Sequence, residues 1–189
     1  MGDPAFFSDR INSFSLVSYI PGPLGEFITN LRQELVAGCV AQSHVTVLPP
    51  RPIGVPAEEA EEILRHWVEP FPSFEVEIVD IGLFIETNVV IADIGAGRSE
   101  LIEMHSALNA GPLYFDEPYE YHPHITLAQN FPAQDVPAVH ALARERWLND
   151  APARSFLVDS LIFVQNTVGN RWIDLAECEL RGAVAVPAR

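Results

Sequence analysis

The hydrophobic residues of the chain follow two periods, which predict a mixture of helices and strands. Apolar residues three and four positions apart, typical of amphipathic helices, occupy segments 24–36, 56–70, 99–111 and 136–148. Runs rich in β-branched and aromatic residues predict strands at 13–20 and 43–50, in three short runs between 74 and 94, and at 121–131, 154–165 and 171–180. No linker-like stretch interrupts this succession, so we predict a single α+β domain.

The order of these elements suggests an internal repeat. From His44 the pattern runs strand, helix, strands, and from His124 it runs strand, helix, strands again. A tryptophan follows each of these histidines at the same interval, as Trp67 and Trp147. We therefore expect two similar β-rich lobes with helices outside, from repeats at about 42–94 and 122–180 within one domain that spans 1–189.

One short phrase occurs in both predicted repeats: "HVTV" begins at His44 and "HITL" begins at His124. Alternate side chains of a strand share a face, so His44 and Thr46 point to one side, and His124 and Thr126 do the same. The residues between them are apolar and suit a buried face. Each phrase therefore presents an imidazole and a hydroxyl together, and a pseudo-twofold would let the two pairs meet across a groove.

Such a groove suits acid–base chemistry on a phosphodiester. Histidine, with a reference pKa of about 6.5, gives or takes a proton near neutrality. One imidazole would deprotonate an attacking water while the other protonates the leaving ribose oxygen. The hydroxyls of Thr46 and Thr126 would bind the non-bridging oxygens as negative charge develops on them. This chemistry requires no metal and no cofactor.

The two phrases resemble the paired signatures of the two-histidine phosphoesterase superfamily, which includes the 2′-5′ RNA ligases and cyclic nucleotide phosphodiesterases. The likeness runs from the first predicted strand to about Leu180. It implies two pseudo-symmetric antiparallel sheets with outer helices and a central cleft, with His44 and His124 as the catalytic pair and Thr46 and Thr126 as phosphate binders. It also implies cofactor-independent action on 2′,3′-cyclic phosphates or 2′-5′ bonds. Gln129 and Asn130 stand where such proteins often carry a basic residue.

Charge narrows the range of partners. The net charge is −15 and the isoelectric point is about 4.6, so the surface repels the backbone of a nucleic-acid duplex. We expect a small nucleotide or a short oligonucleotide phosphodiester as substrate, and a monomeric protein. The beginning of the chain has no signal-peptide pattern, no apolar run reaches the ~20 residues of a membrane span, and Cys39 and Cys178 read as reduced thiols. These features predict a cytoplasmic protein.

Three further residues near the phrases are candidate substrate ligands. His122 shares strand parity with His124 and would bind or steer substrate, although "HPH" also admits a pair of metal ligands or a surface histidine. Arg51 would offset phosphate charge, unless it lies on a solvated loop. Tyr121, like Tyr119, would stack on a base or else pack between the lobes. We expect His66, His105 and His140 to lie on solvated helix faces.

Two rival functions remain open from the sequence. A binding module that keeps the groove would sense a nucleotide without turnover, which the absent basic residue favours. A zinc hydrolase would use the histidines as ligands and would lose its activity on chelation.

Overall fold

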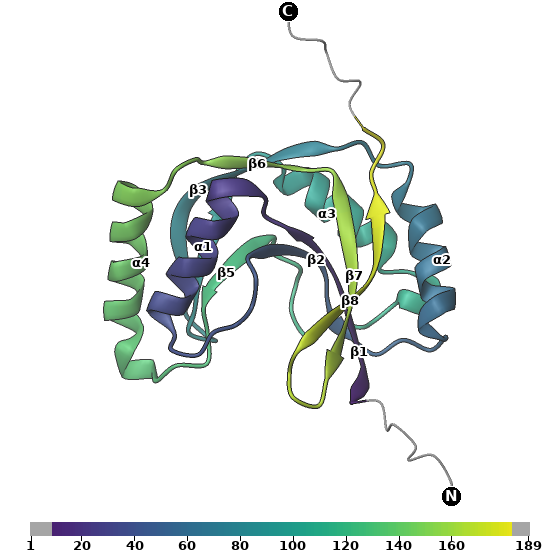
Figure 1. Ribbon diagram of the computed structural model, residues 1–189, viewed down its shortest axis with the longest axis horizontal. Coiled ribbons are helices and arrows are strands. Elements are labelled where there is room, and N and C mark those ends of the chain that lie inside the picture. Colours follow the sequence, from purple (N-terminus) through teal and green to yellow (C-terminus); the bar gives the residue numbers. More distant parts are fainter. Residues whose placement is uncertain (1–8, 183–189) are drawn as a thin grey trace, which may run out of the picture.

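A computed structural model describes residues 9–182, folded into eight strands and four α-helices that form an arch (Figure 1). The strands are β1 (Arg10–Tyr19), β2 (His44–Arg51), β3 (Phe74–Phe84), β4 (Val89–Ile94), β5 (His124–Ala128), β6 (Ser155–Val158), β7 (Ser160–Thr167) and β8 (Trp172–Glu179). The helices are α1 (Gly22–Leu35), α2 (Ala57–Val68), α3 (Arg98–Leu108) and α4 (Val136–Asp150), with short 3₁₀ turns at Gly111–Leu113 and Ala133–Asp135. The predicted α+β class is confirmed.

The strands form two four-stranded sheets, in the orders β2-β1-β7-β8 and β5-β4-β3-β6. Every strand pair in both sheets is antiparallel. The first sheet therefore takes its strands from the two ends of the described chain and the second takes them from the middle, and each predicted repeat contributes strands to both sheets. The two histidine-bearing strands, β2 and β5, each lie at the end of a sheet, and they lie against each other in the middle of the arch (Figure 1).

Two predicted strand boundaries are wrong. The segment from Phe74 to Phe84 is one strand rather than two, because Gly82 continues the ladder opposite Ile91 instead of making a turn. A Cβ at Gly82 would lie 2.7 Å from Oδ2 of Asp93, so a larger residue here would displace that carboxylate. The segment 154–165 is divided at Asp159, and its two parts, β6 and β7, pair in different sheets.

The helices cover the outer faces of the arch, two to each sheet. Helices α1 and α4 pack against the sheet that contains β5, and α2 and α3 pack against the sheet that contains β2 (Figure 1). Helix α2 starts after Pro56 with Glu58 and Glu59 in its first turn, where carboxylates favour the positive end of the helix dipole. The apolar core lies between the helices and the outer faces of the sheets, and it includes Val45, Val47, Ile125 and Leu127.

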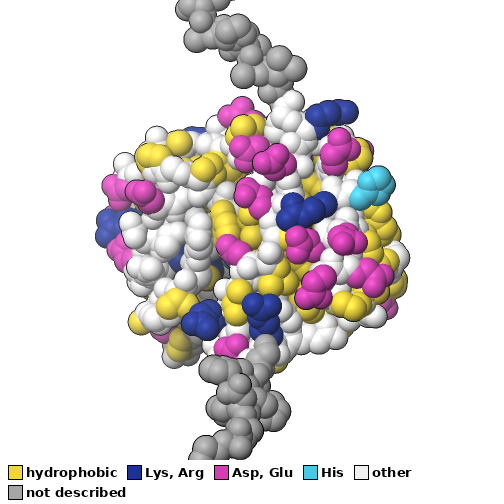
Figure 2. Space-filling view, turned by 45° about the vertical axis from the view of Figure 1, so that its right-hand side comes forward, with side chains coloured by type: hydrophobic (Ala, Val, Ile, Leu, Met, Phe, Trp, Pro, Cys, Tyr) yellow, Lys and Arg dark blue, Asp and Glu magenta, His cyan; other side chains and the backbone are white. Residues whose placement is uncertain are grey.

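The surface carries the acidic excess expected from the sequence. Figure 2 shows acidic side chains scattered across the face that includes α2 and β8, with few basic ones among them. Within residues 9–182, no helix has both the length and the apolar character needed to cross a membrane. The interpretation of the first residues of the chain falls on positions 1–8, outside the described residues.

Candidate active site

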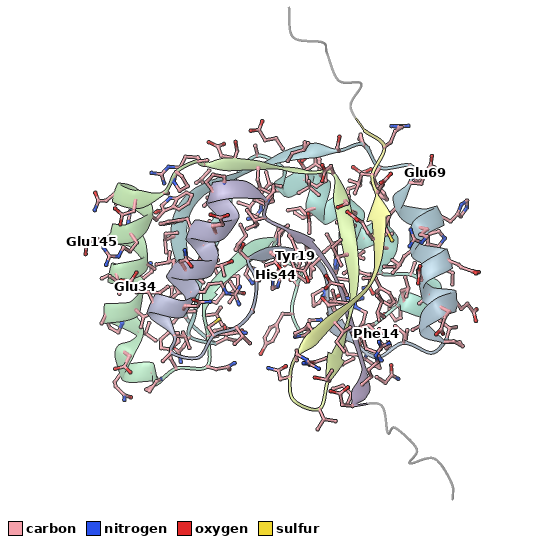
Figure 3. The ribbon with its side chains drawn as sticks, in the orientation of Figure 1. Phe14, Tyr19, Glu34, His44, Glu69 and Glu145 are labelled. Atoms are coloured by element: carbon pink, nitrogen blue, oxygen red, sulfur yellow. The ribbon has the colours of Figure 1, made fainter. Side chains whose placement is uncertain are left out.

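The two phrases come together where β2 and β5 meet, a place we call the motif seam. His44 and Thr46 on β2, and His124 and Thr126 on β5, are all partly exposed. The alternate residues between them are at most 2% exposed and anchor each strand in the core. The alternation predicted from the sequence is therefore present on both strands, and Figure 3 shows His44 on the inner side of the arch, beside Tyr19.

Each histidine is held by a bond to its own chain two residues earlier. Nδ1 of His44 lies 2.8 Å from the carbonyl of Gln42, and Nδ1 of His124 lies 2.7 Å from the carbonyl of His122. A carbonyl oxygen only accepts hydrogen bonds, so Nδ1 carries the proton in both rings. Nε2 of each neutral ring is therefore left with its lone pair, ready to accept a proton.

Burial makes both imidazoles hard to protonate. Loss of hydration is the largest effect on His44 and lowers its pKa to about 4; the bond to Gln42 opposes this, while the charges of Arg32 and His124 lower it further. The pKa of His124 is also lowered, mainly by burial, with the bond to the His122 carbonyl acting in the opposite sense. The influence of His124 on His44 means that the two rings are electrostatically coupled.

The neighbours of the two histidines differ in charge. His124 lies directly across the ladder from Asp93 of β4, and that carboxylate raises the pKa of His124. His44 lies directly across from Tyr19 of β1, a neutral residue whose hydroxyl donates a hydrogen bond to Asp174 at 2.7 Å. Burial and that carboxylate raise the pKa of Tyr19 well above its usual range, so its ring stays neutral. The charges around the two rings therefore differ: Asp93 raises the pKa of His124, although the neighbouring His122 lowers it by more, whereas the charged neighbours of His44, Arg32 and His124, both lower its pKa.

His122 lies beside His124, as predicted, within a polar group of its own. Its Nε2 is 3.2 Å from Oδ1 of Asp93, and the guanidinium of Arg98 lies 3.2 and 3.3 Å from its two ring nitrogens. The ring of Phe84 lies nearly perpendicular to the rings of both His122 and His124, at centroid distances of 5.2 and 4.9 Å. His122 therefore stays a candidate substrate contact at the rim of the seam. Among residues 9–182, no group of three or more His, Cys, Asp or Glu side chains has the arrangement of a metal site.

Arg51 does not face the seam, contrary to both interpretations offered from the sequence. Its side chain is 2% exposed and forms an ion pair with Glu117. It also donates to the side chain of Asn109 at 2.6 Å and to the carbonyls of Pro49 and Leu113. Its donors are taken up by protein groups, so Arg51 is part of the interior and is not available to a substrate.

Tyr121 also serves the interior. Its hydroxyl donates to the carbonyl of Thr46 at 2.7 Å, and its ring stacks on His105 at a centroid distance of 3.9 Å. This is the packing interpretation of Tyr121 rather than the base-stacking one. The solvated position expected for His105 is wrong, because its Nδ1 bonds the carbonyl of Val47 in the interior. His140 is half-buried beside the carbonyl of Ile81, whereas His66 is exposed as expected.

Sequence reasoning missed two residues near the histidines. Tyr19 is placed by the register of β1 on β2, and Arg32 arrives from helix α1 to donate a hydrogen bond to the carbonyl of Thr126 at 2.8 Å. In the sequence, Arg32 sits among the apolar residues of an amphipathic helix, where a buried arginine is unusual. The placement of an arginine on the apolar side of the helix was the signal that could have pointed to Arg32.

The threonine hydroxyls are free to bind a ligand. Neither the Thr46 nor the Thr126 hydroxyl forms a hydrogen bond with any other described residue, although the carbonyl of each accepts one from a side chain. Two imidazole Nε2 atoms and two hydroxyls thus remain uncommitted along the seam, a combination that can exchange protons and bind an anion.

Comparison with known proteins gives the same architecture. Residues 21–170 match the family model of the 2′-5′ RNA ligase superfamily. No curated protein matches the chain. Among solved structures, E. coli LigT complexed with NADP+ is 20% identical with a TM-score of 0.62, over 89% of this chain and 98% of that one. E. coli LigT complexed with 3′-AMP is 19% identical with a TM-score of 0.61, over 89% of this chain and 98% of that one. A crystal structure described as a phosphoesterase is 18% identical with a TM-score of 0.60, over 90% of this chain and 98% of that one.

The likeness to these structures shows the shared fold, and the family model covers most of the chain. Together with two histidine–threonine phrases on adjoining strands, these findings place the protein. The chain belongs to the 2′-5′ RNA ligase superfamily, the two-histidine phosphoesterases.

Proposed function

We propose that this protein is a metal-independent phosphodiesterase that acts on small nucleotides, opening 2′,3′-cyclic phosphates or cleaving 2′-5′ bonds. The observation that carries the proposal is the pair of imidazoles, both fixed through Nδ1 and both with Nε2 uncommitted, on two strands that lie against each other. Solved structures of E. coli LigT hold 3′-AMP, ATP and NADP+, which supports a substrate of nucleotide size.

The asymmetry of the seam supports one assignment of roles. His44 has no carboxylate across its ladder and a pKa near 4, so it is neutral before reaction and acts as the base. His124 has Asp93 beside it, which stabilises the imidazolium, so it acts as the acid. Nε2 of His44 takes a proton from water as the oxygen bonds to phosphorus. The bond from phosphorus to the leaving ribose oxygen breaks, and Nε2 of His124 gives that oxygen a proton.

The threonines would bind the phosphate during this step. The hydroxyls of Thr46 and Thr126 share the faces of the two histidines and would donate to the non-bridging oxygens. Those oxygens gain negative charge in the transition state, so donors held there stabilise it more than they stabilise the substrate.

Hydrolysis of a panel of nucleotides tests the proposal. We expect the purified protein to hydrolyse one or more 2′,3′-cyclic nucleotides or 2′-5′-linked dinucleotides to monophosphates resolved by chromatography. Because both proton transfers use imidazoles, EDTA should leave the rate unchanged, whereas a zinc hydrolase would be inhibited. Loss of activity in EDTA, restored by added zinc, would overturn the metal-independent assignment.

A binding protein without turnover is the second candidate. The exposed and neutral Gln129 and Asn130, where related enzymes often carry a basic residue, favour it. Calorimetric binding of a nucleotide from the same panel, with no product after prolonged incubation, would establish this function in place of the first.

The role assignment predicts an acidic pH optimum. The value of kcat/KM should rise as pH passes the His44 pKa of about 4, because the base must lose its proton. It should fall again as His124, whose pKa is lowered from its ordinary value of 6.5, loses the proton it must donate. The optimum is therefore expected below neutrality.

The Asp93→Asn variant checks which histidine gives the alkaline limb. Removing the carboxylate removes a charge that raises the pKa of His124, so the alkaline limb should move to lower pH while the acidic limb stays in place. A shift confined to the acidic limb would instead make His124 the base.

A further inference from the structure

Arg32 is a buried cation that reaches the motif seam from the outside of the arch. It lies in the last turn of α1, is 4% exposed, and donates a hydrogen bond from Nη1 to the carbonyl of Thr126 at 2.8 Å. Its charge is felt at the other strand as well, because it lowers the pKa of His44. The guanidinium therefore lies at the second phrase, and its charge acts on the histidine of the first.

No carboxylate neutralises this cation. Among residues 9–182, Arg32 forms no ion pair, and its Nε is buried without a hydrogen-bond partner. The nearby carboxylate of the same helix, Glu34, is turned to the surface, where it binds Arg146 at 2.7 Å (Figure 3). A buried charge without a counterion is costly unless a ligand completes it, so the fold keeps this charge at a place where an anion would be stabilised.

The position of Arg32 also indicates which residue supplies positive charge to the seam. Gln129 and Asn130, just after the second phrase, are neutral and exposed, so that part of the chain supplies no cation to the seam. Arg51, the arginine expected there from the sequence, is paired with Glu117 in the interior. Arg98 is held against the ring of His122 at the rim. Among residues 9–182, Arg32 is the buried cation whose Nε has no hydrogen-bond partner, and its charge also acts on His44.

We propose that Arg32 supplies the positive charge that holds the substrate's phosphate at the motif seam. It acts from beneath β5, through the carbonyl of Thr126 that it fixes and through its field in a poorly hydrated region, where a charge acts more strongly than in water. The inference rests on the proposed function for the nature of the substrate, while the anion site itself is testable without turnover.

A merely structural role would have a different signature. If Arg32 served only to link α1 to β5 through its hydrogen bond to the Thr126 carbonyl, it would contribute to the free energy of unfolding but not to the affinity for an anion. The test therefore measures binding of inorganic phosphate by calorimetry and follows the histidine and arginine side chains by NMR, in the full-length native protein and in folded variants.

In the native protein, titration with phosphate should shift the Nε–H signal of Arg32 together with the imidazole signals of His44 and His124. The Nε–H signal of Arg146, which pairs with Glu34 at the surface, should not move. Phosphate binding that leaves the Arg32 signal in place, or no phosphate binding at all, would overturn the proposal.

Arg32→Met should weaken phosphate binding by about tenfold or more and raise the pKa of His44, since a nearby cation has been removed. Arg32→Lys, which keeps the charge, should retain most of the affinity, and Arg146→Met is the matched control with the same loss of charge at the surface. Equal phosphate affinities in the native protein and Arg32→Met would refute the proposal. Should Arg32→Met not fold, the native titration and Arg32→Lys decide.

The two proposals fail separately. Phosphate binding that depends on Arg32, in a protein that hydrolyses no nucleotide, would support the anion site and remove the phosphodiesterase. Hydrolysis of a nucleotide by a protein whose phosphate affinity does not depend on Arg32 would support the phosphodiesterase and remove the Arg32 anion site.

Discussion

Replacing either His44 or His124 with alanine should lower kcat for the best nucleotide substrate by about 10²–10⁴-fold, the range for loss of a general acid or base. Each ring is oriented through Nδ1 by a backbone carbonyl, so alanine removes a positioned proton carrier and leaves the strand intact. Neighbouring residues do not replace it: Tyr19 beside His44 is committed to Asp174, and His122 beside His124 is held by Asp93 and Arg98.

The double variant sharpens this test. Two groups that act in one concerted step are not additive, so the double variant should be only slightly slower than either single one. His66→Ala is the matched control, because His66 is an exposed histidine on α2 and its loss should leave kcat unchanged. Binding of the nucleotide, measured by calorimetry, should persist in all variants. Undiminished turnover in both single variants would refute the acid–base pair.

Glu117→Gln should lower the free energy of unfolding by about 3 kcal/mol, the scale for breaking one side of a buried ion pair. Arginine stays protonated in proteins, and Arg51 is 2% exposed, so the variant would leave a buried cation without its Glu117 carboxylate partner. Glu117 also lies 3.6 Å from Nε2 of His105, which holds the carbonyl of Val47 on β2. The whole cluster fastens β2 to α3 and to the segment before β5.

Urea unfolding monitored by tryptophan fluorescence measures this loss. Asp80→Asn is the control, because its pair with Arg144 is about half exposed and such pairs contribute about 0–1 kcal/mol. The double variant Arg51→Met/Glu117→Gln should lose less than the sum of the two single variants, since no unpaired charge then remains. A Glu117→Gln variant as stable as Asp80→Asn would contradict this account of the cluster.

Much of the site could be predicted because it depends on local geometry. The two-residue period of a strand puts His44 with Thr46 and His124 with Thr126, whatever the rest of the chain does. The repetition of the phrase indicated that two such pairs lie together, and β2 and β5 are indeed in contact. The helices α1, α2 and α4 were also predicted close to their bounds, because their apolar periodicity and their Pro and Gly boundaries are local signals.

The predictions that were wrong concern residues whose environment depends on contacts between distant parts of the chain. Gly82 reads as a turn residue, but its pairing with Ile91 across the ladder keeps it within a strand. Arg51 was expected at the groove or on a solvated loop, and His105 on a solvated helix face, yet Glu117 and the carbonyl of Val47 satisfy them in the interior. Burial of a polar side chain is decided by partners that may be supplied from anywhere in the fold.

The sequence by itself determined the residue types of the seam and their faces and suggested the chemistry that we propose, since strand periodicity and the reference pKa of imidazole are properties of short segments. Only the tertiary structure decided which groups surround them. The register of the ladders put Tyr19 opposite His44 and Asp93 opposite His124, and helix packing brought Arg32 beneath β5. The difference in charged neighbours between His44 and His124 therefore arises from long-range packing, because electrostatic fields depend on distance in space and not on separation along the chain.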